Sequence, residues 1–125
     1  DRIGLFKGSP HSAIHLKGSV AQEQTVQTSG SLTLTEAHGI LVANSSGGNV
    51  TFVLPAISGI TGRQYTFIKR HASNQMIIDP DGSEKIYKAA SPTGGATITY
   101  TDIGSTVTLI CTSIGWVVQS EYIPT

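Results

Sequence analysis

Ser105-Thr-Val-Thr-Leu-Ile-Cys111 alternates threonine with apolar residues, and a similar alternation recurs in Asn49-Val-Thr-Phe-Val-Leu-Pro55, Gln64-Tyr-Thr-Phe-Ile68 and Ala96-Thr-Ile-Thr-Tyr-Thr101. A period of two is typical of a β-strand with one buried face. The polar positions of these segments hold mostly Thr, Ser and Gln and few charged residues. So mild a polar face predicts a sheet that packs against further copies of the same chain.

Turns rich in Gly, Ser, Asp and Pro separate these segments. No window shows a helical period with caps, so almost no helix is expected. Short strands at this spacing predict an all-β fold, either an antiparallel β-sandwich or a jelly-roll-like domain. Because no repeat of fixed period is evident, a solenoid is not expected. The strands are predicted near residues 31–35, 39–43, 49–54, 64–70, 75–79, 84–88, 96–101, 105–111 and 115–120.

The first 30 residues differ in composition from the rest of the chain. The stretch from Gly18 to Gly30 is polar and almost uncharged, and such a stretch has too little apolar content to fold alone. We therefore expect an extended N-terminal segment, residues 1–30, that acts as a linker or pairs with neighbouring chains in an intertwined trimer. Residues 31–125 are predicted to form one β-sandwich domain.

The apolar side of each predicted strand indicates the core. Cys111 is the only cysteine, and its apolar strand predicts a small buried hydrophobe instead of a nucleophile. Trp116 is favoured as a core residue with a bonded N–H, with an exposed sugar-stacking platform as the alternative. The predicted core comprises Val50, Phe52, Leu54, Tyr65, Phe67, Met76, Ile78, Val107, Leu109, Cys111, Trp116 and Val118.

Charge and hydropathy exclude two classes of partner. The formal net charge is zero and 13% of residues are charged, about half the usual share. Without a basic stripe, nucleic-acid binding is not expected, and Lys69-Arg70-His71 is interpreted as the polar end of a strand. No segment reaches the roughly 18 apolar residues that cross a membrane. A net charge near zero favours self-association, which predicts that an oligomer buries much of the surface.

Two motifs resemble metal sites, but neither is complete. His11 and His15 have the spacing of a helical zinc pair, yet Pro10 and strand-like neighbours disfavour the helix that the pair requires. Three copies of one of these histidines could still form a ring on a three-fold axis. Asp79-Pro-Asp-Gly82 lacks the other ligands of a calcium loop and is interpreted as a turn. We expect no metal, no cofactor and no enzymatic activity.

The segment 31–120 is similar to a small β-domain of phage virion proteins, especially tail fibres and tailspikes. An early Leu-Thr-Leu strand at 32–34 precedes Val50-Thr-Phe-Val-Leu-Pro55 and Gly62-Arg-Gln-Tyr-Thr-Phe-Ile-Lys69. The run Ser73–Ile86 and the closing Ser105–Val118 follow in order, and the similarity covers about 90 of 125 residues. Residues 2–18 look like another fibre element. The resemblance implies a homotrimer with a structural or host-attachment role and no catalytic residues.

These observations predict a non-enzymatic module of a fibre or tailspike, located in the virion. Its expected partners are two further copies of itself, other virion proteins and a host-surface glycan. A monomeric carbohydrate-binding module and a trimeric capsid decoration protein remain alternatives. Host contacts are expected on the loops 44–49, 56–63 and 88–95, because binding residues concentrate on loops carried by rigid sheets. The candidate glycan contacts are Asn44, Asn49, Arg63, Tyr87 and Lys88.

Overall fold

The computed structural model describes residues 17–88 and 93–124. The described part of the chain is all-β apart from one 3-10 turn, η1 (Ser45–Gly47). Each of the nine predicted ranges overlaps a strand. The strands are β1 (Gln24–Gln27), β2 (Gly30–Thr33), β3 (Ile40–Ala43), β4 (Val50–Val53), β5 (Gln64–Lys69), β6 (Met76–Asp79), β7 (Ile86–Tyr87), β8 (Ile98–Tyr100), β9 (Thr106–Cys111) and β10 (Trp116–Tyr122).

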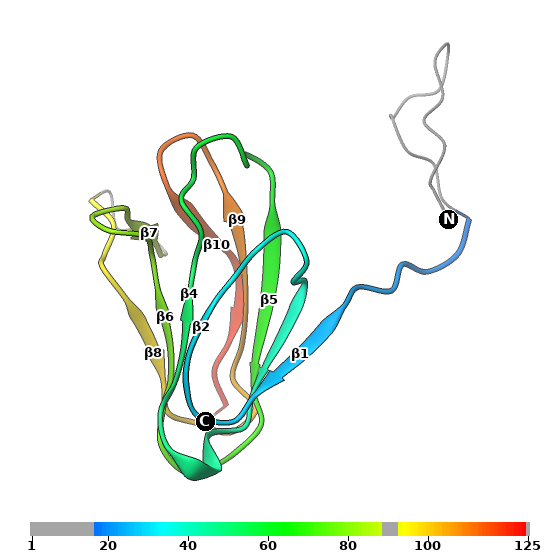
Figure 1. Cartoon of the computed structure of the whole chain (residues 1–125), viewed down its shortest axis with the longest axis vertical. Coiled ribbons are helices and arrows are strands. Elements are labelled where there is room, and N and C mark those ends of the chain that lie inside the picture. The colour runs from blue at the N-terminus through cyan, green and yellow to red at the C-terminus, as the bar shows by residue number, and fades with distance from the viewer. Residues whose placement is uncertain (1–16, 89–92, 125) are drawn as a thin grey trace.

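The strands form two sheets that share one core (Figure 1). The six-stranded sheet has the order β1-β3-β5-β9-β10-β7, and the four-stranded sheet has the order β2-β4-β6-β8. The Phe52 and Phe67 rings, one from each sheet, lie 5.5 Å apart between their centroids. The core therefore lies between the sheets.

The first six strands wind as a coil, because consecutive strands enter the two sheets alternately. β1, β3 and β5 consequently lie parallel in one sheet, and β2, β4 and β6 lie parallel in the other. The coil has no fixed repeat, since Gln24 pairs with Ile40 and Ile40 pairs with Thr66. Unequal turns explain why the sequence shows no solenoid period.

The expected antiparallel arrangement is therefore wrong for most of the fold. Five of the eight strand pairings are parallel, and three are antiparallel. The antiparallel pairs are β6 with β8, β5 with β9, and β9 with β10. Alternation along a strand reports which face is buried but not the direction of the neighbouring strand, so the sequence could not distinguish the two pairings.

The predicted core is confirmed with one refinement. Phe52, Phe67 and Leu109 are fully buried, and Cys111 is 1% exposed. Trp116 is also a core residue, 0% exposed, and it packs against Tyr65 at 5.7 Å between ring centroids. Its indole N–H lacks the expected hydrogen-bond partner among the described residues. The refinement is that Val118 is only half-buried against the core.

The N-terminal region contributes a strand that the sequence did not predict. β1 pairs with β3 of the same chain, so residues 24–27 belong to the six-stranded sheet instead of a linker. Residues 17–23 lead into it and are exposed. Gly39 allows this approach, because a Cβ there would lie 3.0 Å from the Gln22 Cβ. The expectations for residues 1–16, including His11 and His15, lie outside the described residues.

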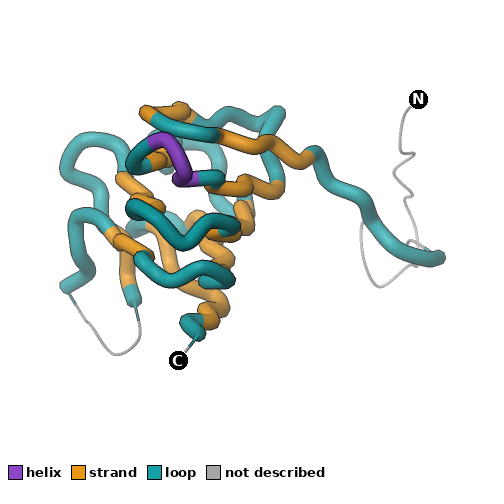
Figure 2. The backbone as a smooth tube through the Cα atoms, turned by 90° about the horizontal axis from the view of Figure 1, so that it is seen from below, coloured by secondary structure: helices purple, strands orange, loops and turns teal. Residues whose placement is uncertain are grey.

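One end of the sandwich is closed by η1, which Figure 2 shows in purple from below. Asn44 caps the turn, because its Oδ1 accepts a hydrogen bond from the Ser46 N–H at 3.3 Å. The Asn74 side chain donates to the Ser45 carbonyl at 2.8 Å, and the Ser45 hydroxyl donates to the Ser73 carbonyl at 2.5 Å. These bonds join the β3–β4 connection to the β5–β6 connection.

Candidate functional site

The five predicted contact residues lie at opposite ends of the sandwich. Asn44 and Asn49 flank η1, where β3 ends and β4 begins. Arg63 precedes β5, whose start lies at the other end because β5 runs parallel to β3. Tyr87 and Lys88 lie near the start of β10, at the same end as Arg63, because Tyr87 pairs with Val117. The five residues therefore do not form one surface.

The two asparagines support the backbone with their side-chain oxygens. Asn44 caps η1, and the Oδ1 of Asn49 accepts a hydrogen bond from the Gln75 N–H at 3.0 Å. Side chains of this type commonly bond to nearby backbone in turns. Both side chains therefore have a structural role in the connections that they bond to.

Tyr87 is held by two glycines from distant turns. A Cβ on Gly94 would lie 3.0 Å from the Tyr87 Cε1, and a Cβ on Gly115 would lie 2.9 Å from the Tyr87 Cε2. Both glycines have positive φ, +69° and +152°, which side chains rarely adopt. The ring is thus wedged between two places where only glycine fits without adjustment, and Tyr87 is half-buried.

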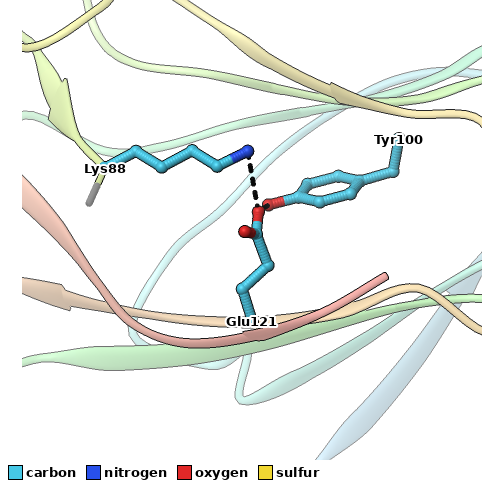
Figure 3. Close-up of polar contacts among 3 residues, drawn as sticks. All are labelled: Lys88, Tyr100 and Glu121. Carbon is cyan, nitrogen blue, oxygen red and sulfur yellow. Dashed lines mark hydrogen bonds and ion pairs between the residues drawn. The ribbon is translucent and has the colours of Figure 1, made fainter. Parts of the chain in front are cut away.

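Lys88, Tyr100 and Glu121 form a polar cluster that links the two sheets (Figure 3). The Tyr100 hydroxyl donates to Oε2 of Glu121 at 2.6 Å, and the Lys88 ammonium lies 3.0 Å from the same oxygen. The Lys88 Nζ also lies 5.8 Å from the centroid of the Tyr100 ring, within the range of a cation–π interaction. The sequence had singled out Lys88 but not its two partners.

Burial and hydrogen bonding shift the titration of this cluster. Burial is the largest cause that raises the pKa of Tyr100, and the hydrogen bond and charge of Glu121 raise it further. For Glu121, burial acts to raise the pKa, but hydrogen bonds from Tyr100 and Lys88 and the Lys88 charge outweigh it. The pKa of Glu121 is therefore lowered, so its carboxylate remains ionised while it holds the sheets together.

Lys69 is fully buried, contrary to its interpretation as a polar strand end. Its ammonium donates to the carbonyls of His71 and Ser73, the latter at 3.4 Å. Burial lowers the pKa of Lys69, and the Asp102 charge opposes this shift. The sequence missed the burial because the bonding groups are backbone carbonyls, which have no residue-specific signature. The ammonium binds the loop after β5 and is not available to a ligand.

The outer edges of β1 and β2 have no partner strand within residues 17–88 and 93–124. The carbonyls of Glu23 and Gln27 accept hydrogen bonds from the β3 side. Because the backbone groups of successive residues in a strand point to opposite sides, those of Gln24 and Val26 point away from β3. On β2, the Gly30 and Leu34 N–H groups donate to carbonyls on the β4 side. The same alternation directs Ser31 and Thr33 outward.

Neither β1 nor β2 contains a charged residue or a proline, although Glu23 directly precedes β1. Charged residues, proline and very short strands protect an edge, whereas β1 (QTVQ) and β2 (GSLT) are uncharged and have four residues each. The opposite edges are shorter. β7 has two residues between Lys85 and Lys88, and β8 has three residues with Asp102 close after it. The edge of the sandwich formed by β1 and β2, called the β1–β2 edge below, is therefore the better template for a further strand.

A shallow pocket of about 220 Å³ lies beside the start of β1. It is lined by Gln22, Glu23, Glu36, Ala37, His38 and Gly39. The Nδ1 of His38 accepts a 2.9 Å bond from the Thr35 N–H. In the part of the chain that the structure describes, no group of three or more His, Cys, Asp or Glu residues is placed to hold a metal ion. None of the described helices is long and apolar enough to cross a membrane.

The sequence matches no model of a known protein family, and a search of curated proteins returns no match.

Proposed function

We propose that this chain is a non-enzymatic structural module of a phage fibre or tailspike, and that it assembles into a homotrimer through the β1–β2 edge. The observation that supports the assembly is that β1 and β2, two uncharged strands on the same edge of the sandwich, have no partner strand on their outer side among residues 17–88 and 93–124. Unpaired N–H and C=O groups favour strand addition. The resemblance of residues 31–120 to phage virion β-domains supports location in the virion.

Host attachment is the second part of this proposal. A trimer presents three copies of each loop, so weak contacts with a surface glycan add through multivalency. Arg63, Tyr87 and Lys88 lie at the end of the sandwich away from η1. Arg63 and Tyr87 are the better candidates for this contact, because Asn44 and Asn49 already bond to backbone and Lys88 is paired with Glu121. Binding of the full chain to host cells, compared with its Arg63→Ala variant, tests this part.

The assembly is tested by light scattering on the full chain and on two lysine variants. Val26→Lys places a charge on the β1 edge at a side chain that is 50% exposed. Ile114→Lys is the matched control, because Ile114 is a β-branched residue, 68% exposed, in the β9–β10 turn. We expect a trimer for the wild type and the control and a smaller species for Val26→Lys.

A monomeric wild-type chain at micromolar concentration would contradict the proposal and favour the carbohydrate-binding module. If Val26→Lys forms a trimer to the same extent as Ile114→Lys, the interface lies elsewhere. Electron microscopy of the parent particle, with the protein labelled, then distinguishes a tail fibre from a capsid decoration protein by its position.

A further inference from the structure

The directions of β1 and β2 restrict how copies of the chain can pair. β1 runs toward the η1 end and β2 runs back from it, as Figure 1 shows, because a short turn at residues 28–29 joins them. An axis parallel to the strands keeps the polarity of every copy. Around such an axis, β1 of one copy and β2 of the next copy are antiparallel, the arrangement whose inter-strand hydrogen bonds lie perpendicular to the strands and are slightly more stable per residue than parallel ones.

On the basis of the proposed assembly, we propose that β1 pairs antiparallel with β2 of a second copy, so that each six-stranded sheet continues into the four-stranded sheet of its neighbour. A second copy fits the β1–β2 edge because both strands are uncharged, so no like charges meet. The opposite edges offer shorter strands, of two residues in β7 and three residues in β8.

The turn between the strands also determines a register. In the proposed register, residues that are equidistant along the chain from the 28–29 turn lie opposite each other in neighbouring copies. Val26 therefore lies opposite Ser31 of the neighbouring copy, and Gln24 lies opposite Thr33. These four residues are the ones whose backbone groups point outward at the two edges. The register thus brings every outward-facing residue of β1 against an outward-facing residue of β2.

Closure of this pairing allows a three-fold ring. Each copy offers one β1 edge and one β2 edge, so every copy uses both edges when the contact is repeated around a cyclic axis. In a trimer, three β1–β2 contacts surround the axis. Two copies can close through the same contact in a dimer, so the number of chains has to be measured.

Disulfide cross-linking tests both the partner strand and the register. A hydrogen-bonded antiparallel pair has a Cα separation of about 5.5 Å, which a disulfide can bridge. Val26→Cys and Ser31→Cys chains, one with a size tag, are co-expressed and oxidised under mild conditions. We expect a tagged–untagged cross-link that contains both cysteines by mass spectrometry. Each variant alone should give at least tenfold less covalent dimer.

The double variant Val26→Cys/Ser31→Cys should give a covalent trimer in a denaturing gel without reductant. Wild type is the control for Cys111, which is 1% exposed, and Ile114→Cys is the control for a random exposed thiol. A dominant cross-link between position 26 of one copy and position 26 of another would overturn the inference, because it requires β1 to pair with β1. A stable trimer without a cross-link between positions 26 and 31 would also overturn it, because the trimer would then form without pairing of β1 with β2.

Failure of the inference is distinguishable from failure of the proposed function. A monomer by light scattering rejects the assembly itself. A trimer that lacks the Val26–Ser31 cross-link rejects only the strand pairing. A covalent dimer from the double variant retains the pairing and rejects the three-fold axis.

Discussion

The Tyr100 hydroxyl donates a 2.6 Å hydrogen bond to the Glu121 carboxylate and thereby joins β8 of one sheet to β10 of the other. Tyr100 is 2% exposed, and the side chain of Glu121 is 19% exposed. The bond is charge-assisted, but Glu121, taken as a whole residue, is one of the exposed residues of β10, so solvent screens part of its strength. This bond links the two sheets near the edge of the sandwich opposite the β1–β2 edge.

The Glu121 cluster predicts a loss of stability in acid. Because the folded-state pKa of Glu121 is lowered, the stabilisation is present above the unfolded pKa, about 4.3 for glutamate. It is lost as the pH falls through the lower folded-state value. We expect Glu121→Gln to reduce stability by about 1 kcal/mol or less at pH 7, because solvent screens the partly exposed carboxylate, and to flatten its decline below pH ~4.3.

Urea unfolding at a series of pH values from 7 to 2 measures this effect. Glu36→Gln is the control, because it makes the same change at a glutamate that is exposed and lies outside the cluster. The same acid slope in Glu121→Gln and wild type would show that the cluster does not contribute to the pH dependence.

The contact between Phe67 and Phe52 predicts a large loss on truncation. Phe67 is fully buried and also lies 6.3 Å from the Tyr65 ring, between centroids. Phe67→Ala should reduce the free energy of unfolding by about 3–5 kcal/mol, because the cavity between the sheets cannot fully collapse. Chemical denaturation measures the change, and Ile114→Ala in the exposed turn should change stability by less than about 0.5 kcal/mol. Equal losses in both variants would be inconsistent with the core described above.

The close approach of Gly115 to Tyr87 predicts that this glycine is required. Gly115→Ala would place a Cβ 2.8 Å from the Lys85 carbonyl and 2.9 Å from the Tyr87 ring, at a φ of +152°. We expect a loss of about 2–4 kcal/mol from backbone strain and overpacking together.

Gly59→Ala is the control, because Gly59 also has a positive φ, +79°, but no atom lies within 4 Å of the added Cβ. It should lose only about 1–2 kcal/mol, the cost of the backbone conformation. Thermal melts of both variants give the comparison. Equal losses would indicate that contact with Tyr87 has no energetic effect.

A pair of proline variants separates the two sides of β1. The N–H of Val26 points outward and that of Thr25 points toward β3, by the alternation of the β1–β3 hydrogen bonds. Val26→Pro should therefore preserve the fold and weaken the trimer, because proline removes a donor only from the outer edge. Thr25→Pro should also lower the melting temperature, because it removes a bond to β3.

Analytical ultracentrifugation and thermal melts are measured on the two proline variants and wild type. An unchanged trimer in Val26→Pro would argue against strand addition at this edge. A melting temperature that falls equally in both variants would show that the outward and inward positions of β1 are assigned incorrectly.

The sequence located most strands and their buried faces, because alternation is a local property. Phe52, Phe67 and Leu109 could be assigned to the core from their own strands alone, and all three are fully buried. β1 was missed because Gln24-Thr-Val-Gln27 is polar and weakly periodic, and it becomes a strand through backbone bonds to β3. The candidate contacts were proposed from loop positions, which do not report that Asn49 bonds to Gln75.

By itself, the sequence determined that the chain is all-β, where nearly all of its strands lie and which side chains face inward. Only the tertiary structure decided which strands are neighbours, and with it the parallel coil and the burial of Lys69. The physical reason is that strand pairing depends on backbone groups, which are the same in every residue except proline. For this reason the outer edges of β1 and β2, which have no partner strand in the part of the chain that the structure describes and on which the proposed assembly depends, could be found only in the folded chain.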